Sequence, residues 1–294
     1  MKGSEGIQNK QAYYDIKETP TWYVDKIPAF CINLERRIDR WNQFSAQPGV
    51  QQMPNIKRFI GVDGSKLDIM SDPRIPLYTK KNIKNKTRRA HEELSTEGGI
   101  GCALSHIAVW EWIVENQANV TMVFEDDAKV PPLFMPYMNE LIQTSPTLKD
   151  TSQWELFVLT HQKSVSKAIP KDPLIHTLDG FVGFQCYFIT LECAKRFLTE
   201  AYTLHLHIDL WTAVFKQIYG LKLICHPSFA VKQRNSKTDI QQASRCKMCD
   251  LNPTFYKTHE MVLKEEKWLI RSVEIALVAG FLYAGYSFIT HNRP

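Results

Sequence analysis

Three consecutive acidic residues, Glu125, Asp126 and Asp127, follow the apolar run NVTMVF at 119–124. Clustered carboxylates repel each other and raise each other's pKa values, so the arrangement is costly unless a cation offsets it. Carboxylate oxygens suit Mg²⁺ or Mn²⁺, and substrate phosphates commonly complete the coordination shell. An acidic helix start is the alternative, but Pro131–Pro132 place any helix several residues later. This acidic cluster predicts a cation–diphosphate site, with Glu125 and Asp127 on one side of the strand and Asp126 on the other.

A second group of polar residues lies at the end of the first apolar run, 27–33, and just beyond it. The group consists of Asn33, Arg36, Arg37 and Arg40. Arg36 and Arg40 are four residues apart and therefore share one face of the predicted helix 34–44. Guanidinium groups bind anionic groups well, which makes these arginines candidates for binding an anionic ligand. Surface ion pairing is the alternative for each of them.

These side chains need elements that bring them together. Short apolar runs alternate with amphipathic segments, which is typical of an α/β layered fold with a largely parallel sheet. The predicted strands are 27–33, 57–62, 119–124, 154–160, 184–190 and 221–225, and the predicted helices are 34–44, 100–115, 134–143, 191–202 and 208–219. In such sheets, ligands bind beyond the carboxyl ends of the strands. Asn33, Asp63 and the acidic cluster fall at such ends, so we expect them to share one site.

The predicted helix 100–115 follows two glycines, Gly98 and Gly99, and carries three residues of chemical interest. Cys102 lies in an apolar run and is expected to be a small buried residue. Ser105 and His106 either pack the helix against the sheet or contact a ligand, and the sequence leaves both readings open.

Composition limits the class of protein. The chain has 294 residues, of which 44% are hydrophobic and 23% charged, which excludes a disordered, collagenous, disulfide-rich or multi-span membrane protein. The net charge is +5, and the segment 80–89 holds six basic residues and no acid. The remainder is close to neutral, which argues against a nucleic-acid partner. The basic segment is read as a solvated loop, with contact to an anionic substrate or membrane surface as the alternative.

The C-terminal part of the chain carries an apolar stretch. Ile275–Ile289 has fifteen residues without a charge. Together with Val273, Glu274 and Thr290 it would form a helix of about 27 Å, near the lower limit for crossing a bilayer. Ala276, Gly280 and Ala284 recur at the spacing typical of closely packed membrane helices, which would allow a helix-mediated homodimer. A buried terminal helix of the main domain is the alternative.

We expect four segments along the chain. They are a polar N-terminal extension at 1–24, the main domain at 25–241, a linker at 242–268 and a C-terminal transmembrane anchor at 269–290. The N-terminal extension has no apolar stretch of signal-peptide length, and basic residues precede the anchor. The expected location is therefore a membrane, in single-pass form, with the main domain on the cytosolic side.

Several segments, in order, resemble glycosyltransferase family 25, which includes bacterial lipooligosaccharide galactosyltransferases and procollagen galactosyltransferases. CINLERRIDRW at 31–41 is similar to the family's opening strand and helix, and GGIGCALSHIAVW at 98–110 to its second signature. The acidic cluster takes the place of the family's metal motif. Further similar segments are QCYFIT at 185–190, HIDLW at 207–211 and the Pro…Gln…Ser stretch at 227–236. The resemblance spans about 27–241.

The resemblance implies a GT-A-like nucleotide-diphospho-sugar transferase fold, a UDP-sugar donor with galactose as first candidate, and Mn²⁺ or Mg²⁺ as cofactor. It also implies transfer with inversion to a hydroxyl of a glycan or protein acceptor. Inversion needs a general base; Asp209 is the candidate, with a helix cap as its alternative. The implied cation ligands are Glu125, Asp127 and His226. The implied donor-binding residues are Asn33, Arg36, Arg37, Arg40, Asp63, Ser105, His106, Glu125 and Asp126. A catalytically inactive member that binds a glycan or protein partner is the alternative function.

Overall fold

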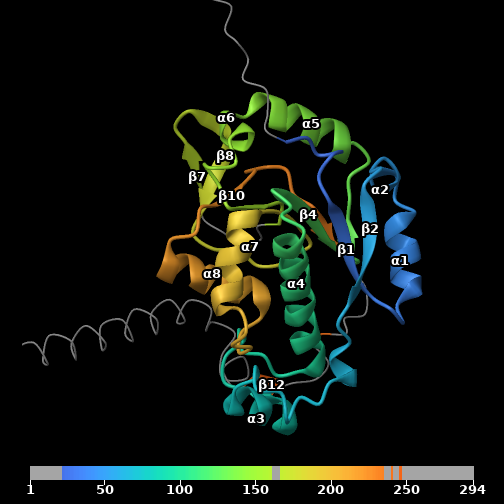
Figure 1. Ribbon diagram of the computed structural model, residues 1–294, viewed down its shortest axis with the longest axis vertical. Helices are drawn as coiled ribbons and strands as arrows, with labels where there is room; N and C mark the ends of the chain where they lie inside the picture. The colour runs from blue at the N-terminus through green and yellow to red at the C-terminus, as the bar shows by residue number, and fades with distance from the viewer. Residues whose placement is uncertain (1–21, 161–165, 235–239, 241–244, 247–294) are drawn as a thin grey trace, which may run out of the picture.

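A computed structural model describes residues 22–160, 166–234, 240 and 245–246. In this part of the chain eight strands form one sheet in the order β2-β1-β4-β9-β6-β10-β8-β7 (Figure 1). They are β1 (Ala29–Leu34), β2 (Ile56–Gly61), β4 (Val120–Glu125), β6 (Leu156–Val158), β7 (Ser166–Ile169), β8 (Asp172–Leu178), β9 (Cys186–Thr190) and β10 (Leu223–Cys225). Short ladders pair β5 (Ala128–Lys129) with β11 (Lys232–Gln233) and β3 (Thr87–Arg88) with β12 (Arg245–Cys246).

The helices connect these strands and cover the sheet. They are α1 (Ile38–Ser45), α2 (Pro48–Gln51), α3 (Leu77–Asn85), α4 (Glu97–Glu115), α5 (Phe134–Thr144), α6 (Pro146–Lys149), α7 (Leu191–Glu200) and α8 (Ile208–Tyr219), with a 3-10 turn, η1 (Gly64–Lys66). The fold is therefore mixed α/β, and most of the predicted strands and helices are present with shifted ends.

The sheet is mixed rather than mostly parallel. β1 runs parallel to β2 and β4, and β6 runs parallel to β10. The pairings β4–β9, β9–β6, β10–β8 and β8–β7 are antiparallel. Parallel strands need a crossover, usually a helix, but the β7–β8 hairpin joins β6 to β9, and β9 returns between β4 and β6 in the opposite direction. The predicted largely parallel sheet is wrong because the sequence pattern did not reveal β7 and β8.

The predicted C-terminal transmembrane helix is also corrected. Within the residues that the structure describes, no helix combines the length and the apolar character needed to cross a membrane. The predicted segment, Ile275–Ile289, lies outside the described residues. The described fold is thus mixed α/β and does not include a membrane-spanning element.

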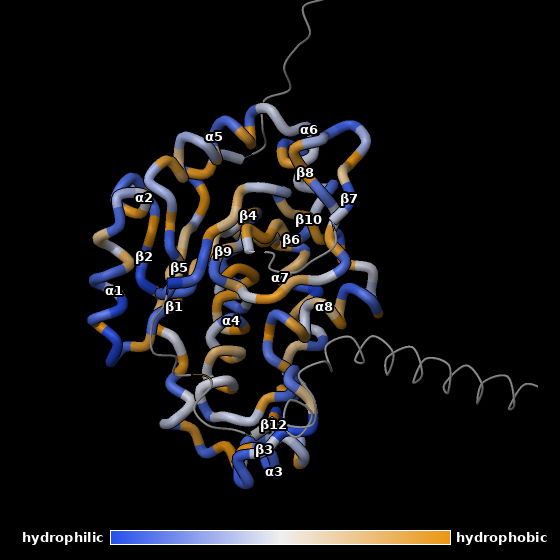
Figure 2. Tube along the Cα trace, turned by 180° about the vertical axis from the view of Figure 1, so that it is seen from behind, coloured by the Kyte–Doolittle hydropathy of each residue, from blue (hydrophilic) through white to orange (hydrophobic). Residues whose placement is uncertain are grey.

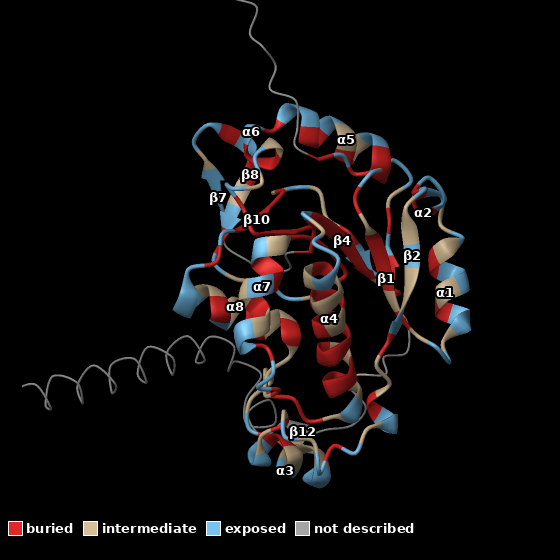
Figure 3. Ribbon diagram, in the orientation of Figure 1, coloured by how far each residue is buried: buried red, intermediate tan, exposed pale blue. Residues whose placement is uncertain are grey.

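The central strands of the sheet are buried on both faces, namely β1, β4, β6, β9 and β10 (Figure 3). Phe30 and Val123 pack into a hydrophobic core shared with α4, α7 and α8. Their neighbours Cys31 and Phe124 belong to the core on the other face, shared with α1 and α5. This alternation follows from the strand period of two residues. Apolar segments accordingly gather at β4, β6 and β9, whereas α1 and α3 are polar and peripheral (Figure 2).

The basic segment 80–89 is not a loop, as the sequence had suggested. Its residues form the end of α3, the left-handed residue Lys86 (φ 50°) and strand β3. Arg88 is buried, and Arg89 forms an ion pair with Glu93 at 2.6 Å. Lys86 lines the cavity described below, which places part of the basic segment beside the candidate site.

Glycine allows α4 to pack closely against the turn that follows β2. A Cβ atom on Gly101 would lie 2.5 Å from the carbonyl oxygen of Val62 and 2.6 Å from the amide nitrogen of Gly64. At the start of α4, the Thr96 hydroxyl accepts a hydrogen bond from the Gly99 amide at 3.1 Å, which caps the helix. The glycine-rich motif thus brings the first turn of α4 onto the carboxyl end of β2.

We expect Gly101→Ala to lower the free energy of unfolding by about 1–3 kcal/mol, because the added methyl group would overlap backbone atoms of the β2–η1 turn. Gly180→Ala is the matched control, since its Cβ would meet only the Cβ of Ala213, at 3.4 Å. Urea denaturation of both variants measures the difference. Equal stability of the two variants would show that α4 can move away from β2 without cost.

Candidate functional site

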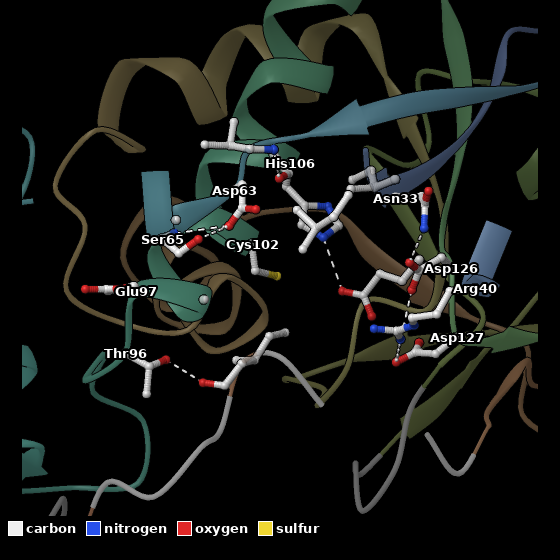
Figure 4. Close-up of a pocket in the computed structure, with 18 of the residues that line it drawn as sticks. Asn33, Arg40, Asp63, Ser65, Thr96, Glu97, Cys102, His106, Asp126 and Asp127 are labelled. Carbon is white, nitrogen blue, oxygen red and sulfur yellow. Dashed lines mark hydrogen bonds and ion pairs between the residues drawn. The ribbon is translucent and has the colours of Figure 1, made fainter. Parts of the chain in front are cut away.

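The parallel strands β1, β2 and β4 end at the same edge of the sheet. Ile32 lies opposite Glu125 in the β1–β4 pairing, and Leu34 lies opposite Gly61 in the β1–β2 pairing. A cavity of about 510 Å³ opens at this edge (Figure 4), a size typical of small-molecule sites. The first turns of α4 and residue Gln233 of β11 complete its wall.

The cavity brings together most of the residues singled out in the sequence. Those in its wall are Asn33, Arg36, Arg40, Asp63, Ser105, His106, Glu125, Asp126 and Asp127. In Figure 4, Asn33, Arg40, Asp126 and Asp127 form one side of the cavity, and Asp63 and Thr96 lie on the opposite side. The structure therefore places the polar groups that follow three separate strands at one site.

Arg37 and His226 are not part of the cavity wall. Arg37 forms two hydrogen bonds with Asp39, both of 2.9 Å, which lower the pKa of Asp39 to about 2 and agree with the alternative of surface ion pairing. His226 Nε2 is 2.6 Å from the hydroxyl of Tyr137, and its Nδ1 accepts the backbone N–H groups of Ser228 and Phe229. Both ring nitrogens of His226 are engaged by these contacts, which does not favour its predicted role as a cation ligand.

Asp209 also lies outside the cavity wall. It is the second residue of α8, where its Oδ1 accepts the N–H of Leu210 at 2.9 Å. Its Oδ2 accepts the N–H of Gly183 at 2.7 Å, and Gly183 has a φ of +91° that favours glycine. These contacts tie the loop before β9 to the start of α8, which favours a structural role over the predicted role of general base.

Arg40 neutralises two of the three acids of the cluster. Its Nη2 lies 2.8 Å from Asp126 Oδ1 and 2.9 Å from Asp127 Oδ2, and all three residues are buried. Asn33 donates a further hydrogen bond to Asp126 at 2.6 Å. Burial raises the pKa of Asp126, and the charge of Arg40 opposes that rise. From the sequence, a bound cation was expected to offset the repulsion between these carboxylates. In the structure Arg40 already acts as the counter-ion of Asp126 and Asp127.

Glu125 and Asp127 are the two acids of the cluster that can still bind a cation. Burial, followed by the charge of Asp127, raises the pKa of Glu125 well above its usual range. Oδ1 of Asp127 is buried and accepts no hydrogen bond from any described residue. A divalent cation held by these carboxylates would favour the ionised form of Glu125 and would give Oδ1 of Asp127 a partner, so the residues present fit a hard cation.

Cys102 also lies near Glu125, although the sequence did not predict it as a site residue. Ligand atoms of Cys102, His106 and Glu125 all lie within 4.8 Å of one another. Burial and the charge of Glu125 raise the pKa of the Cys102 thiol well above its usual value, so the thiol is neutral and is a poor metal ligand. The predicted burial of Cys102 is confirmed in part, because the residue is partly buried. Nothing in the sequence indicated that it would line the cavity.

Ser105 uses its hydroxyl to hold α4 against β2. It donates to the carbonyl of Gly101 at 2.6 Å and accepts the N–H of Val62 at 2.8 Å. These bonds favour the packing reading of Ser105. Arg36 lies 2.8 Å from Asp63 at the cavity wall, and a hydrogen bond from Ser65, with a further one from Arg36, lowers the pKa of Asp63.

The segment after β10 closes over the acidic cluster. β11 pairs antiparallel with β5, directly after the cluster. Gln233 donates to Asp127 Oδ2 at 3.0 Å, and the backbone N–H of Arg234 donates to the carbonyl of Asp127 at 2.7 Å. The guanidinium group of Arg234 also donates to the carbonyl of Asp126. The sequence did not predict Gln233 or Arg234 as site residues, although the stretch 227–236 resembles a motif of the family.

The chain is similar in sequence to proteins of a known family. The sequence profile of glycosyltransferase family 25, described as an LPS biosynthesis protein, matches residues 26–212. A glycosyltransferase 25 family member of Aedes aegypti is 30% identical over 205 residues, covering 66% of this chain and 33% of its own. Procollagen galactosyltransferase 2 of Homo sapiens is 27% identical over 198 residues, covering 60% and 30%. The chain thus spans about a third of the length of these relatives.

Proposed function

This chain belongs to glycosyltransferase family 25, and we propose that it transfers a hexose from a UDP-sugar to a hydroxyl group of a glycan or protein, with inversion. One observation carries the proposal: Oδ1 of Asp127, which accepts no hydrogen bond from the described residues, and the carboxylate of Glu125 lie in one cavity with the polar groups that follow β1 and β2. Galactose is the first candidate sugar because a human relative is named procollagen galactosyltransferase 2.

Glu125 and Asp127 would hold Mn²⁺ or Mg²⁺ in this cavity. When bound, the cation would supply positive charge against the charge that develops on the leaving diphosphate. Arg36 and Lys86 line the same cavity and can bind the anionic part of the donor. Arg40, held by Asp126 and Asp127, keeps these two carboxylates in place instead of reaching the donor directly.

A general base must come within hydrogen-bond reach of the attacking hydroxyl. Glu97 lines the cavity in the first turn of α4, is exposed, and forms no hydrogen bond or ion pair within the described part of the chain. Asp209, in contrast, lies outside the wall with both oxygens bonded to backbone N–H groups. The proposal therefore assigns the base to Glu97 in place of Asp209.

Two amide substitutions separate these roles. Glu97→Gln should lower kcat by about 10²–10⁴-fold and leave UDP affinity nearly unchanged, because an amide cannot accept the proton. Asp209→Asn should lower the free energy of unfolding by about 1–3 kcal/mol, because its NH₂ group would face a backbone N–H. Steady-state kinetics and urea denaturation measure the two effects. A loss of kcat in Asp209→Asn at unchanged stability would return the role of base to Asp209.

The alternative function is an inactive family member that binds a glycan or a protein partner. Calorimetric titration with UDP, in the presence and absence of Mn²⁺, distinguishes the two. Mn²⁺-dependent UDP binding, together with release of UDP from one member of a UDP-sugar panel, supports the enzyme. Glycan binding without any affinity for UDP supports the binding module.

A further inference from the structure

A buried chain of polar side chains extends from the core to Glu125. Nε1 of Trp110 lies 3.2 Å from the hydroxyl oxygen of Tyr187, which lies 2.9 Å from Nδ1 of His106. Nε2 of His106 lies 3.3 Å from Oε1 of Glu125. Trp110 and His106 belong to α4 and Tyr187 to β9, and all three are 0% exposed. Burying polar groups in a hydrophobic core is unfavourable unless each is hydrogen-bonded, and these three side chains, called here the Trp–Tyr–His chain, bond to one another and to Glu125.

The chemistry of each group determines the direction of its hydrogen bonds. The indole N–H of Trp110 can only donate, so the Tyr187 oxygen is the acceptor of that bond. The hydroxyl proton of Tyr187 is then directed at Nδ1 of His106, which accepts it. A neutral imidazole whose Nδ1 accepts a hydrogen bond carries its one proton on Nε2. That proton is donated to the carboxylate of Glu125.

The opposite direction would satisfy fewer groups. If a protonated Glu125 donated to Nε2, the Nδ1–H of His106 would donate to Tyr187. The Tyr187 oxygen would then accept two hydrogen bonds, and its own proton would have no acceptor among the described residues. A buried donor without an acceptor is destabilising. The Trp–Tyr–His chain therefore favours His106 as the donor and Oε1 of Glu125 as the acceptor.

We infer that His106 and Tyr187 are positioning residues, which hold the side chain of Glu125 in one orientation for a divalent cation. The inference rests on the proposed function, because it assumes that Glu125 binds the cation. A neutral donor suits this task, since it stabilises the carboxylate without adding a positive charge that would repel the cation. Only Oε1 is occupied by His106, which leaves Oε2 for the cation.

Removing a single hydroxyl group tests the inference. In Tyr187→Phe, His106 loses the donor that sets its tautomer, and we expect Mn²⁺ affinity to fall about 10–100-fold. The electron paramagnetic resonance signal of free Mn²⁺, titrated in the presence of UDP, measures this affinity without any turnover. Tyr137→Phe is the matched control, because it removes a hydroxyl from another Tyr–His pair, the 2.6 Å contact with His226 outside the cavity. Its Mn²⁺ affinity should equal that of the parent protein.

Two substitutions of His106 separate positioning from packing and serve also if Tyr187→Phe does not fold. Glutamine presents an amide N–H near the position of Nε2, whereas leucine fills the space without a donor. We expect His106→Leu to bind Mn²⁺ about 10–100-fold more weakly than the parent, and His106→Gln to recover most of that loss.

Equal Mn²⁺ affinity in His106→Leu and His106→Gln, or parental affinity in a folded Tyr187→Phe, would overturn the inference while leaving the proposed function intact. If the parent protein itself does not bind Mn²⁺ in the presence of UDP, the proposed function fails, and this inference fails with it.

Discussion

Asp127→Asn should lower kcat by about 10²–10³-fold and remove Mn²⁺-dependent UDP binding, while the domain stays folded. The two oxygens of Asp127 have different surroundings. Oδ2 accepts hydrogen bonds from Arg40 at 2.9 Å and from Gln233 at 3.0 Å, whereas the buried Oδ1 accepts none from the described residues. Asparagine can keep its carbonyl oxygen toward Arg40 and Gln233. It then presents an NH₂ donor where the cation needs an acceptor.

Calorimetry with UDP, with and without Mn²⁺, and turnover of the best donor measure this effect, and thermal unfolding checks the fold. Asp150→Asn is the control, because Asp150 is an exposed carboxylate whose contacts with Ser152 and Gln153 are local. We expect it to behave like the parent protein. Activity of Asp127→Asn within a few-fold of the parent would contradict the assignment of Asp127 to the cation.

The position of the site could be predicted because it depends on local patterns. Apolar runs ended by Asn33, Asp63 and the acidic cluster indicated three strands with polar groups at their carboxyl ends. In parallel strands such ends meet at one edge, and the register of β1 with β2 and β4 brings them together. The family resemblance also depends on local patterns. Its glycine-rich motif at 98–110 contains Gly101, which packs closely against the β2–η1 turn.

The partners of individual side chains could not be predicted, because long-range packing selects them. Arg40 lies on the same predicted helix face as Arg36, yet it turns inward to Asp126 and Asp127, which are more than eighty residues away in sequence. His226 bonds to Tyr137 because β10 ends near α5, on the core face opposite α4. The direction of β9 depends on a hairpin whose strands, β7 and β8, are half-exposed and lack a continuous apolar pattern.

Arg40→Met should be strongly destabilising, with a loss of about 3–5 kcal/mol in the free energy of unfolding at neutral pH. The guanidinium group is the shared counter-ion of Asp126 and Asp127, and all three side chains are buried. Methionine keeps most of the apolar volume of the side-chain stem. The loss should therefore come mainly from two carboxylates left without their counter-ion, and only to a small extent from a cavity.

The pH dependence of the loss identifies its origin. In the parent protein burial raises the pKa of Asp126, and Arg40 is the largest opposing influence. Without Arg40 this pKa rises further above its value in the unfolded chain. An acid with a raised pKa in the folded state destabilises that state at high pH, and the penalty disappears as the pH falls below the unfolded-state pKa, about 4 for aspartate. The stability difference between parent and Arg40→Met should therefore be largest near pH 7 and shrink towards pH 4.

Urea denaturation near pH 7 and near pH 5 measures this difference. Arg36→Met is the matched control, because Arg36 pairs with Asp63 at 2.8 Å but its side chain is 45% exposed, and such pairs contribute only about 0–1 kcal/mol. A deficit of Arg40→Met that is the same at both pH values would mean that Arg40 acts through packing. Mn²⁺ with UDP should reduce the deficit near pH 7, because a cation at Asp127 would supply part of the positive charge that Arg40 supplies in the parent protein.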